Sequence, residues 1–260
     1  MTFLRATPRI AAALALAIGL VAAGAFARAE WRRADAARLL RAAPEAVIAD
    51  PGLMAVARAI AKPAYDANCA ACHRDGAGDS TRGVPAFAPG GWLYGSGDVY
   101  DIERTIAHGV RSGDPKGRNL ADMPAFAREK PYAREKIDPL SPDDIDDAAE
   151  FVVSLSSGDA DAAAAARGKA LFEGRGGCSD CHGGDGRGDQ AIGGPNLTGP
   201  RWLWGDGARE TLRDSIARGH AGVCPAWDRR LDPAVIRGLA LYVLDLSKGR
   251  GRAATNGKSP

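Results

Sequence analysis

The chain has 260 residues, which is enough for two ordinary domains. Aromatic residues make up only 6% of it, whereas glycine (33 residues) and proline (16 residues) are plentiful, so side chains alone build a thin core. The formal net charge of +2 argues against a nucleic-acid partner. A large apolar cofactor would supply much of the missing core.

Residues 1–29 differ in character from the rest of the chain. Two arginines, Arg5 and Arg9, precede an uncharged apolar run, Ile10–Ala27. As a helix this run would be about 27 Å long, just enough to cross a bilayer. Small residues at 25–29 also fit a signal-peptide cleavage site. We therefore predict an N-terminal hydrophobic helix that is either a signal peptide or a membrane anchor, and in both cases the rest of the chain lies outside the cytoplasm.

Residues 30–62 form a helical lead-in. The sequence predicts one or two exposed helices between Trp31 and Lys62, interrupted at Pro44 and Pro51. Met54 lies on an apolar helical face of this segment, so we expect it to contribute to packing.

An internal repeat occupies most of the remaining sequence. Cys69–His73 (Cys-Ala-Ala-Cys-His) recurs 109 residues later as Cys178–His182 (Cys-Ser-Asp-Cys-His). Further matched pairs follow in the same order: Trp92–Gly95 with Trp202–Gly205, Thr105–Gly109 with Ser215–Gly219, and Met123–Phe126 with Cys224–Trp227. We therefore predict two domains of one kind, at 63–157 and 162–248.

Each copy ends in an apolar periodic segment with a clear helix start. Ser141-Pro142 and Asp232-Pro233 place a capping side chain before a proline at the first helical position. The helix of the first copy should end near 156–161, where an Ala-rich run begins the second copy. No strand-like alternation appears, so the predicted fold class is all-α, and residues 249–260 should be a flexible tail.

The pentapeptide Cys-x-x-Cys-His is the attachment signature of c-type haem. The two thiols bond covalently to the porphyrin, and the histidine binds iron. Structural zinc sites usually have their two Cys-x-x-Cys halves about 12 to 20 residues apart, much closer than here. A redox dithiol would not explain a following histidine in both copies. The sequence therefore predicts two covalently bound haem c groups, held by Cys69, Cys72 and His73, and by Cys178, Cys181 and His182.

The iron also needs a ligand on its other face. Met123 lies 50 residues after His73, in a loop and before a proline, so we predict that it binds the first haem. The matching position in the second copy is Cys224, which we predict as a thiolate ligand of the second haem. Two alternatives stay open for that haem: ligation by His220, or an open iron with Cys224 as a small buried side chain.

Two prolines and one more histidine complete the candidate residues. Pro85 and Pro195 each stand seven residues before the first Trp of their copy. Their carbonyl oxygens could accept the ring N–H of the ligating histidine, or they could be ordinary turn prolines. His108 corresponds to Arg218 in the other copy, so we do not expect it to bind iron.

With these motifs, the sequence resembles the dihaem subunit III of cbb3-type cytochrome c oxidases, bacterial haem–copper terminal oxidases. The resemblance runs from about Trp31 to Ser247 and includes Ile48–Pro51, both haem motifs, both Trp-Leu-aromatic-Gly motifs, Asn196–Thr198 and the stretch from His108 to Phe126. It implies a membrane helix followed by two tandem class I cytochrome c domains. This chain departs from the family at Arg74, where glycine is usual, and at Cys224, where methionine is usual.

The resemblance implies electron transfer in a respiratory chain, on the periplasmic side of the cytoplasmic membrane. The expected partners are other respiratory-chain subunits or a soluble cytochrome c donor, and the protein is not expected to be an enzyme by itself. Two other functions remain open on the sequence. One is a dihaem oxidoreductase acting on a small sulfur compound, and the other is a haem-based gas sensor whose second iron is open.

Overall fold

A computed structural model describes residues 8–131 and 137–256 of the chain. In these residues the regular structure is helical, and β-structure is limited to isolated bridges, in agreement with the predicted all-α class. The helices are α1 (Pro8–Arg41), α2 (Pro44–Ala49), α3 (Pro51–Asn68), α4 (Ala70–His73), α5 (Val99–His108), α6 (Pro142–Ser156), α7 (Ala162–Glu173), α8 (Ser179–His182), α9 (Arg209–Arg218) and α10 (Pro233–Asn256).

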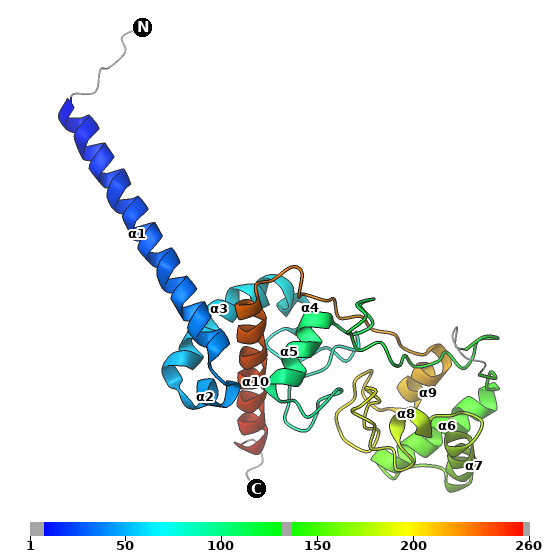
Figure 1. Cartoon of the computed structure of the whole chain (residues 1–260). Helices are drawn as coiled ribbons and strands as arrows, with labels where there is room; N and C mark the ends of the chain where they lie inside the picture. Colours follow the sequence, from blue (N-terminus) through cyan, green and yellow to red (C-terminus); the bar gives the residue numbers. More distant parts are fainter. Residues whose placement is uncertain (1–7, 132–136, 257–260) are drawn as a thin grey trace.

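Helix α1 projects away from the rest of the molecule (Figure 1). It contains the apolar run 10–27, and several large side chains of this run are about two-thirds exposed: Leu16, Ile18, Leu20, Val21 and Phe26. No helix in the described part of the chain is long and apolar enough to cross a membrane. The expectation of a spanning hydrophobic helix is therefore not confirmed.

The lead-in segment contributes to a hydrophobic core. Asp50 caps α3 by accepting hydrogen bonds from the backbone N–H groups of Gly52 and Leu53. One face of the segment is buried in a cluster that we call the first core: Leu39, Val47, Met54, Ala57, Ala61, Tyr65, Phe87, Val99, Ile102, Leu239, Ala240, Leu241 and Val243. The expected packing role of Met54 agrees with this, whereas the lead-in helices are not simply exposed.

Helices α6 and α10 begin where the sequence predicts. Ser141 and Asp144 form a capping box at the start of α6, and Asp232 accepts a hydrogen bond from the N–H of Ala234, at 2.8 Å, at the start of α10. The end of α10 differs from the expectation, because the helix continues through Asn256 where a flexible tail was predicted from 249. The last part of that tail, 257–260, lies outside the described residues.

The two repeats exchange their last helices. Helix α6, from the first repeat, packs against α7 and α9, whereas α10, from the second repeat, packs against α3 and α5 (Figure 1). Helices α6, α7 and α9 build what we call the second core: Phe126, Leu140, Ile145, Ala148, Ala149, Val152, Val153, Leu171, Leu212 and Ile216. The packing thus differs from the expected division into units 63–157 and 162–248.

Ion pairs between helices follow the same exchange. On one side, Arg58 of α3 pairs with Asp245 of α10 at 2.9 Å, and Arg237 of α10 pairs with Glu103 of α5 at 2.5 Å. On the other side, Arg167 of α7 pairs with Asp147 of α6 at 2.7 Å, and Arg209 of α9 pairs with Glu150 of α6. These ion pairs join each exchanged helix to the helices on which it packs.

Each exchanged helix crosses a partner at a glycine. A Cβ atom on Gly168 of α7 would lie 1.9 Å from the carbonyl oxygen of Asp147, in α6. In the equivalent crossing, a Cβ on Gly238 of α10 would lie 3.2 Å from the carbonyl oxygen of Ala57, in α3. The backbones approach this closely only because no side chain separates them.

Candidate functional site

The first Cys-x-x-Cys-His motif forms the short helix α4 directly after α3. The thiols of Cys69 and Cys72 are free, so neither is used in a disulfide. The His73 ring stacks on Phe87, with ring centroids 4.7 Å apart, and burial lowers the pKa of His73. The carbonyl of Pro85 lies near the ring and partly opposes this lowering of the pKa. Nδ1 of His73 nevertheless makes no hydrogen bond. The imidazole is therefore held in its neutral, metal-binding form.

The second motif forms α8 in the same way. Neither of its cysteines, Cys178 and Cys181, forms a disulfide. Nδ1 of His182 lies 2.8 Å from the carbonyl oxygen of Pro195, and burial lowers the pKa of His182. Because the carbonyl can only accept, this contact assigns the ring proton to Nδ1 and leaves Nε2 available for a metal. Pro195 thus has the place that the sequence suggested.

The two segments that carry the candidate sixth ligands cross each other. Met123 and His220 exchange a pair of backbone hydrogen bonds, with N–O distances of 2.9 and 3.1 Å. Val110 and Cys224 exchange an equivalent pair, with distances of 2.9 and 3.0 Å. The segment that contains Met123 is therefore bonded to the residues just after α9, and the segment that contains Cys224 is bonded to the residues just after α5.

This crossing changes the surroundings of Met123 and Cys224. Met123 packs against the second core, and the segment after it is bonded to the end of α9, with Phe126 N–H donating to Ile216 O at 3.2 Å. Cys224 instead lies close enough to Cys69 and Cys72 for their charges to interact. Cys224 thus lies near the first haem motif, and Met123 lies beside the core that contains helices of the second repeat.

The electrostatics of the first motif reflect this arrangement. Burial, with smaller contributions from the nearby Cys224 and Cys72, raises the pKa of the Cys69 thiol to about 11. Burial likewise raises the pKa of the Cys224 thiol, with a smaller contribution from Cys72. The sulfur atoms of Cys69, Cys72 and Cys224 therefore lie near one another beside α4.

The structure places Cys224 near the cysteines of the first motif and Met123 beside the second core, whereas the predicted pairs were Met123 with His73 and Cys224 with His182. Sequence spacing suggested these pairs because each ligand follows the haem motif of its own repeat. The structure instead carries each segment across to the opposite core. Spacing along the chain contains no signal for this, because both copies have the same spacing and both cores accept the same kind of segment.

Two aromatic residues that the sequence analysis did not assign a role also cross between the repeats. Trp204, in the second Trp-Leu-aromatic-Gly motif, lies against Gly83, in the loop after the first haem motif. Tyr94, its counterpart in the first repeat, lies against Gly193 in the second. A Cβ at Gly83 would come within 2.0 Å of Trp204, so only glycine fits there. In the sequence, the only indication of these contacts was the presence of glycine at both positions, Gly83 and Gly193.

His220 and His108 lie apart from the two haem motifs. The His220 ring stacks on Trp204, with centroids 3.9 Å apart and planes 6° from parallel, and its buried Nε2 makes no hydrogen bond. His108, at the end of α5, faces Asp114 and Asp228.

The donor set of each motif fits a c-type haem. Each motif offers two cysteines outside any disulfide on one short helical turn, and a histidine whose pKa is lowered by burial. Sulfur, as thioether in Met123 and thiol in Cys224, is a soft donor that suits haem iron. The hydrogen bond from His182 to Pro195 is the kind of outer contact that orients a ligating imidazole.

Comparison with known proteins supports the same conclusion. The family model of cytochrome c matches residues 59–156, and the model described as cytochrome c oxidase, cbb3-type, subunit III matches residues 163–243. The chain is 38% identical over 220 residues to the cbb3-type cytochrome c oxidase subunit FixP of Azorhizobium caulinodans, covering 84% of this chain and 70% of that protein.

Other relatives bear a related name. The chain is 39% identical over 204 residues to subunit CcoP of Azospirillum brasilense, covering 76% of this chain and 65% of that protein. It is 34% identical over 230 residues to subunit CcoP of Rhodobacter capsulatus, covering 85% of this chain and 73% of that protein. The chain thus spans about two-thirds of the length of these relatives.

Proposed function

Because this chain belongs to the subunit III family of cbb3-type cytochrome c oxidases, we propose that it carries electrons towards the catalytic subunit of such an oxidase. Two covalently bound haem c groups accompany this family assignment, and each supplies one-electron exchange at its iron. The observation that carries the proposal is the presence of two complete Cys-x-x-Cys-His motifs, each followed by a partly buried sulfur side chain in one of the crossing segments.

The covalent attachments would come from within each repeat. Cys69 and Cys72 would hold one haem and Cys178 and Cys181 the other. His73 and His182 would bind the irons through Nε2, since Pro195 O occupies Nδ1 of His182. These roles are the ones the sequence predicted.

The sixth ligands would be exchanged between the repeats. We assign Cys224 to the haem attached at Cys69 and Cys72, because the Cys224 thiol interacts with both of these thiols. We assign Met123 to the haem of the second motif, because it packs in the second core. The repeats would then depend on each other for complete iron coordination.

This exchange affects the redox order. An anionic thiolate from Cys224 would stabilise ferric iron and lower the potential at the first motif, whereas the Met123 thioether would raise the potential at the second. With the pairing expected from sequence spacing, electron transfer from the first motif to the second would be uphill. With the exchanged pairing, the same direction is downhill.

A membrane position would bring the domains close to a membrane-bound oxidase. The run 10–27 in α1 has a charged start and exposed apolar side chains, which supports retention as an anchor over cleavage. Mass spectrometry of the mature protein from washed membranes should then detect peptides from this run. A soluble mature protein that starts after Ala27 would show instead that the run is a signal peptide.

Complementation tests the function. The gene should be expressed in a bacterium that lacks its own subunit III but makes the other subunits of a cbb3-type oxidase. We expect the chain to co-purify with those subunits, to contain two haems per chain that resist acid–acetone extraction, and to restore oxygen consumption driven by a reduced soluble c-type cytochrome. A matched control is Cys178→Ala with Cys181→Ala, which should abolish this oxygen consumption. Failure of the wild-type chain to bind the oxidase subunits would contradict the proposal.

Selective removal of one haem tests the exchanged ligands. The double variant Cys69→Ala, Cys72→Ala should lose the thiolate-type ferric electron-resonance signal and keep the near-infrared charge-transfer band of methionine-ligated iron. The reciprocal variant Cys178→Ala, Cys181→Ala should lose the charge-transfer band and keep the thiolate signal. The opposite pattern in either variant would show that each repeat supplies its own sixth ligand.

A further inference from the structure

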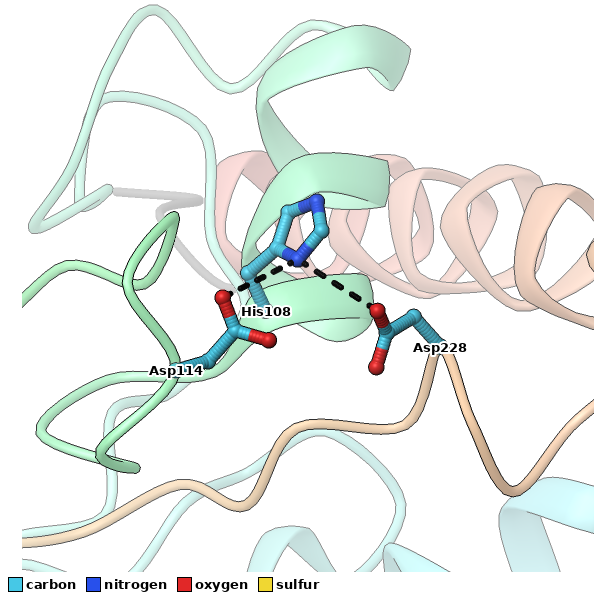
Figure 2. Close-up of side chains that lie close together, drawn as sticks. All are labelled: His108, Asp114 and Asp228. Atoms are coloured by element: carbon cyan, nitrogen blue, oxygen red, sulfur yellow. Dashed lines mark ion pairs between the residues drawn. The ribbon is translucent and has the colours of Figure 1, made fainter.

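Three potential metal ligands converge at the crossing of the two repeats. His108 is the last residue of α5, Asp114 lies in the loop that follows, and Asp228 lies four residues after Cys224, in the segment from the second repeat (Figure 2). One ligand atom from each of these side chains lies within 4.8 Å of the other two. Asp228 is 114 residues after Asp114 and 120 residues after His108 in the sequence. These side chains meet because the segments of the two repeats cross.

The contacts between these side chains are too long for hydrogen bonds. Nδ1 of His108 is 3.5 Å from Oδ1 of Asp114 and 3.9 Å from Oδ2 of Asp228, and this buried nitrogen makes no hydrogen bond. A protonated imidazole bonded directly to a carboxylate would approach to about 2.8 Å. Two ligands of one tetrahedral zinc ion, with bonds of about 2.0 to 2.1 Å, are instead about 3.4 Å apart. The observed spacing matches the second case.

The backbone holds the ligands in place. The N–H of Asp228 donates to Ala107 O at 3.0 Å, which fixes this residue beside the last turn of α5. The Ser112 hydroxyl donates to His108 O at 2.6 Å and accepts from the N–H of Asp114 at 3.1 Å. The loop and the crossing segment are therefore both tied to the helix that carries the histidine.

The charge at the site favours a cation. The backbone N–H of Lys116 donates to Oδ1 of Asp114 at 2.7 Å and, with a contribution from His108, holds the pKa of Asp114 below its usual range. Hydrogen bonds of this kind are common at carboxylates that bind metals. Arg229 contributes one opposing positive charge near Asp114, which leaves the two carboxylates in excess.

We propose that His108, Asp114 and Asp228 bind a divalent transition-metal ion of the zinc class. One imidazole nitrogen and two carboxylate oxygens suit zinc, whereas calcium and magnesium prefer sites made of oxygen alone. Three protein ligands leave one tetrahedral position for water. The ion would join the end of α5 to the segment that carries Cys224 and so stabilise the crossing of the two repeats.

Calorimetric titration of the purified dihaem protein with zinc sulfate, after treatment with a chelator, tests this site. We expect one zinc ion per chain with a dissociation constant in the micromolar range or below. The variants His108→Ala and Asp228→Asn should each weaken binding at least tenfold. Asp185→Asn is the matched control, because Asp185 is an exposed aspartate outside the cluster, and it should bind like the wild type.

Thermal unfolding supplies a second measurement that does not depend on electron transfer. Zinc should raise the Tm of the wild type and of Asp185→Asn but not that of His108→Ala, and magnesium should have no such effect. The visible haem spectrum shows whether each variant has folded. Stoichiometric binding that persists in both His108→Ala and Asp228→Asn, or no zinc binding by the folded wild type, would overturn the proposal.

Discussion

The backbones of Val110 and Cys224 are joined by two hydrogen bonds, although these residues belong to different repeats. Gly109, next to Val110, makes this approach possible, because a Cβ there would lie 2.3 Å from the carbonyl oxygen of Cys224. Gly219 allows the equivalent approach of Met123 in the other repeat. In both crossings, a glycine therefore allows the two backbones to come close enough to form hydrogen bonds.

Replacing Cys224 by methionine should change the haem of the first motif. Cys224→Met exchanges an anionic ligand for a neutral thioether, so the potential of the haem attached at Cys69 and Cys72 should rise, on the order of 200 mV. A redox titration followed by visible spectra measures this change. Cys224→Ala should instead give a high-spin iron that binds carbon monoxide rapidly. A wild type that already binds carbon monoxide rapidly would show that Cys224 is not a ligand.

Replacing Arg74 by glycine should stabilise the protein. Arg74 has φ 54° and ψ −130°, a conformation that disfavours side chains, whereas the equivalent residue after the second motif is Gly183. We expect Arg74→Gly to raise the free energy of unfolding by about 1 kcal/mol. The variant Arg74→Ala is the control, because it removes the exposed ion pair with Asp79 but keeps the Cβ. Equal stability of the two variants in denaturant titrations would count against backbone strain at this position.

The close crossing of α7 and α6 should not tolerate a side chain at Gly168. A methyl group there would overlap the carbonyl oxygen of Asp147, so the helices would have to separate. We expect Gly168→Ala to lower the free energy of unfolding by about 3 kcal/mol. Gly184→Ala is the control, because a Cβ at Gly184 would have no neighbour within 4 Å. An unchanged midpoint for Gly168→Ala in urea would mean that α6 does not pack on α7 as described.

Glu150 should make stability depend on pH at the acid end. The side chain is 12% exposed, and its pKa is lowered mainly by the hydrogen bond from Arg209. Because the folded-state pKa lies below the unfolded-state value of about 4.3, the ion pair stabilises the protein above that pH and loses this effect as the pH falls through the folded pKa.

Denaturant titrations at pH 7 and pH 3 measure this effect. Arg209→Gln should be less stable than the wild type at pH 7, and the difference should shrink at pH 3. Arg187→Gln, which removes the exposed contact with Asp185, should change little at either pH. A difference between Arg209→Gln and the wild type that is the same at both pH values would contradict the assigned ion pair.

Local sequence was sufficient to identify the haem-binding residues and the helix starts. Cys69–His73 and Cys178–His182 are contiguous, so their chemistry follows from neighbouring residues alone. The same is true of the caps at Ser141 and Asp232, which act on the N–H groups two or three residues later. The repeat, the fold class and the family resemblance all rested on such local signals.

Only the tertiary structure decided on which copy each last helix and each candidate ligand segment packs. The apolar faces of α6 and α10 have the same periodicity, so either could cover either core. The choice is made by contacts far apart in sequence, such as Arg237 with Glu103 and Arg167 with Asp147. For the same reason, no pattern in the sequence indicated that Asp228 would lie beside His108 and Asp114. Because the sequence is repeated, the apolar faces of α6 and α10 are similar and each could pack on either core. Contacts between residues far apart in the sequence select one of these two arrangements.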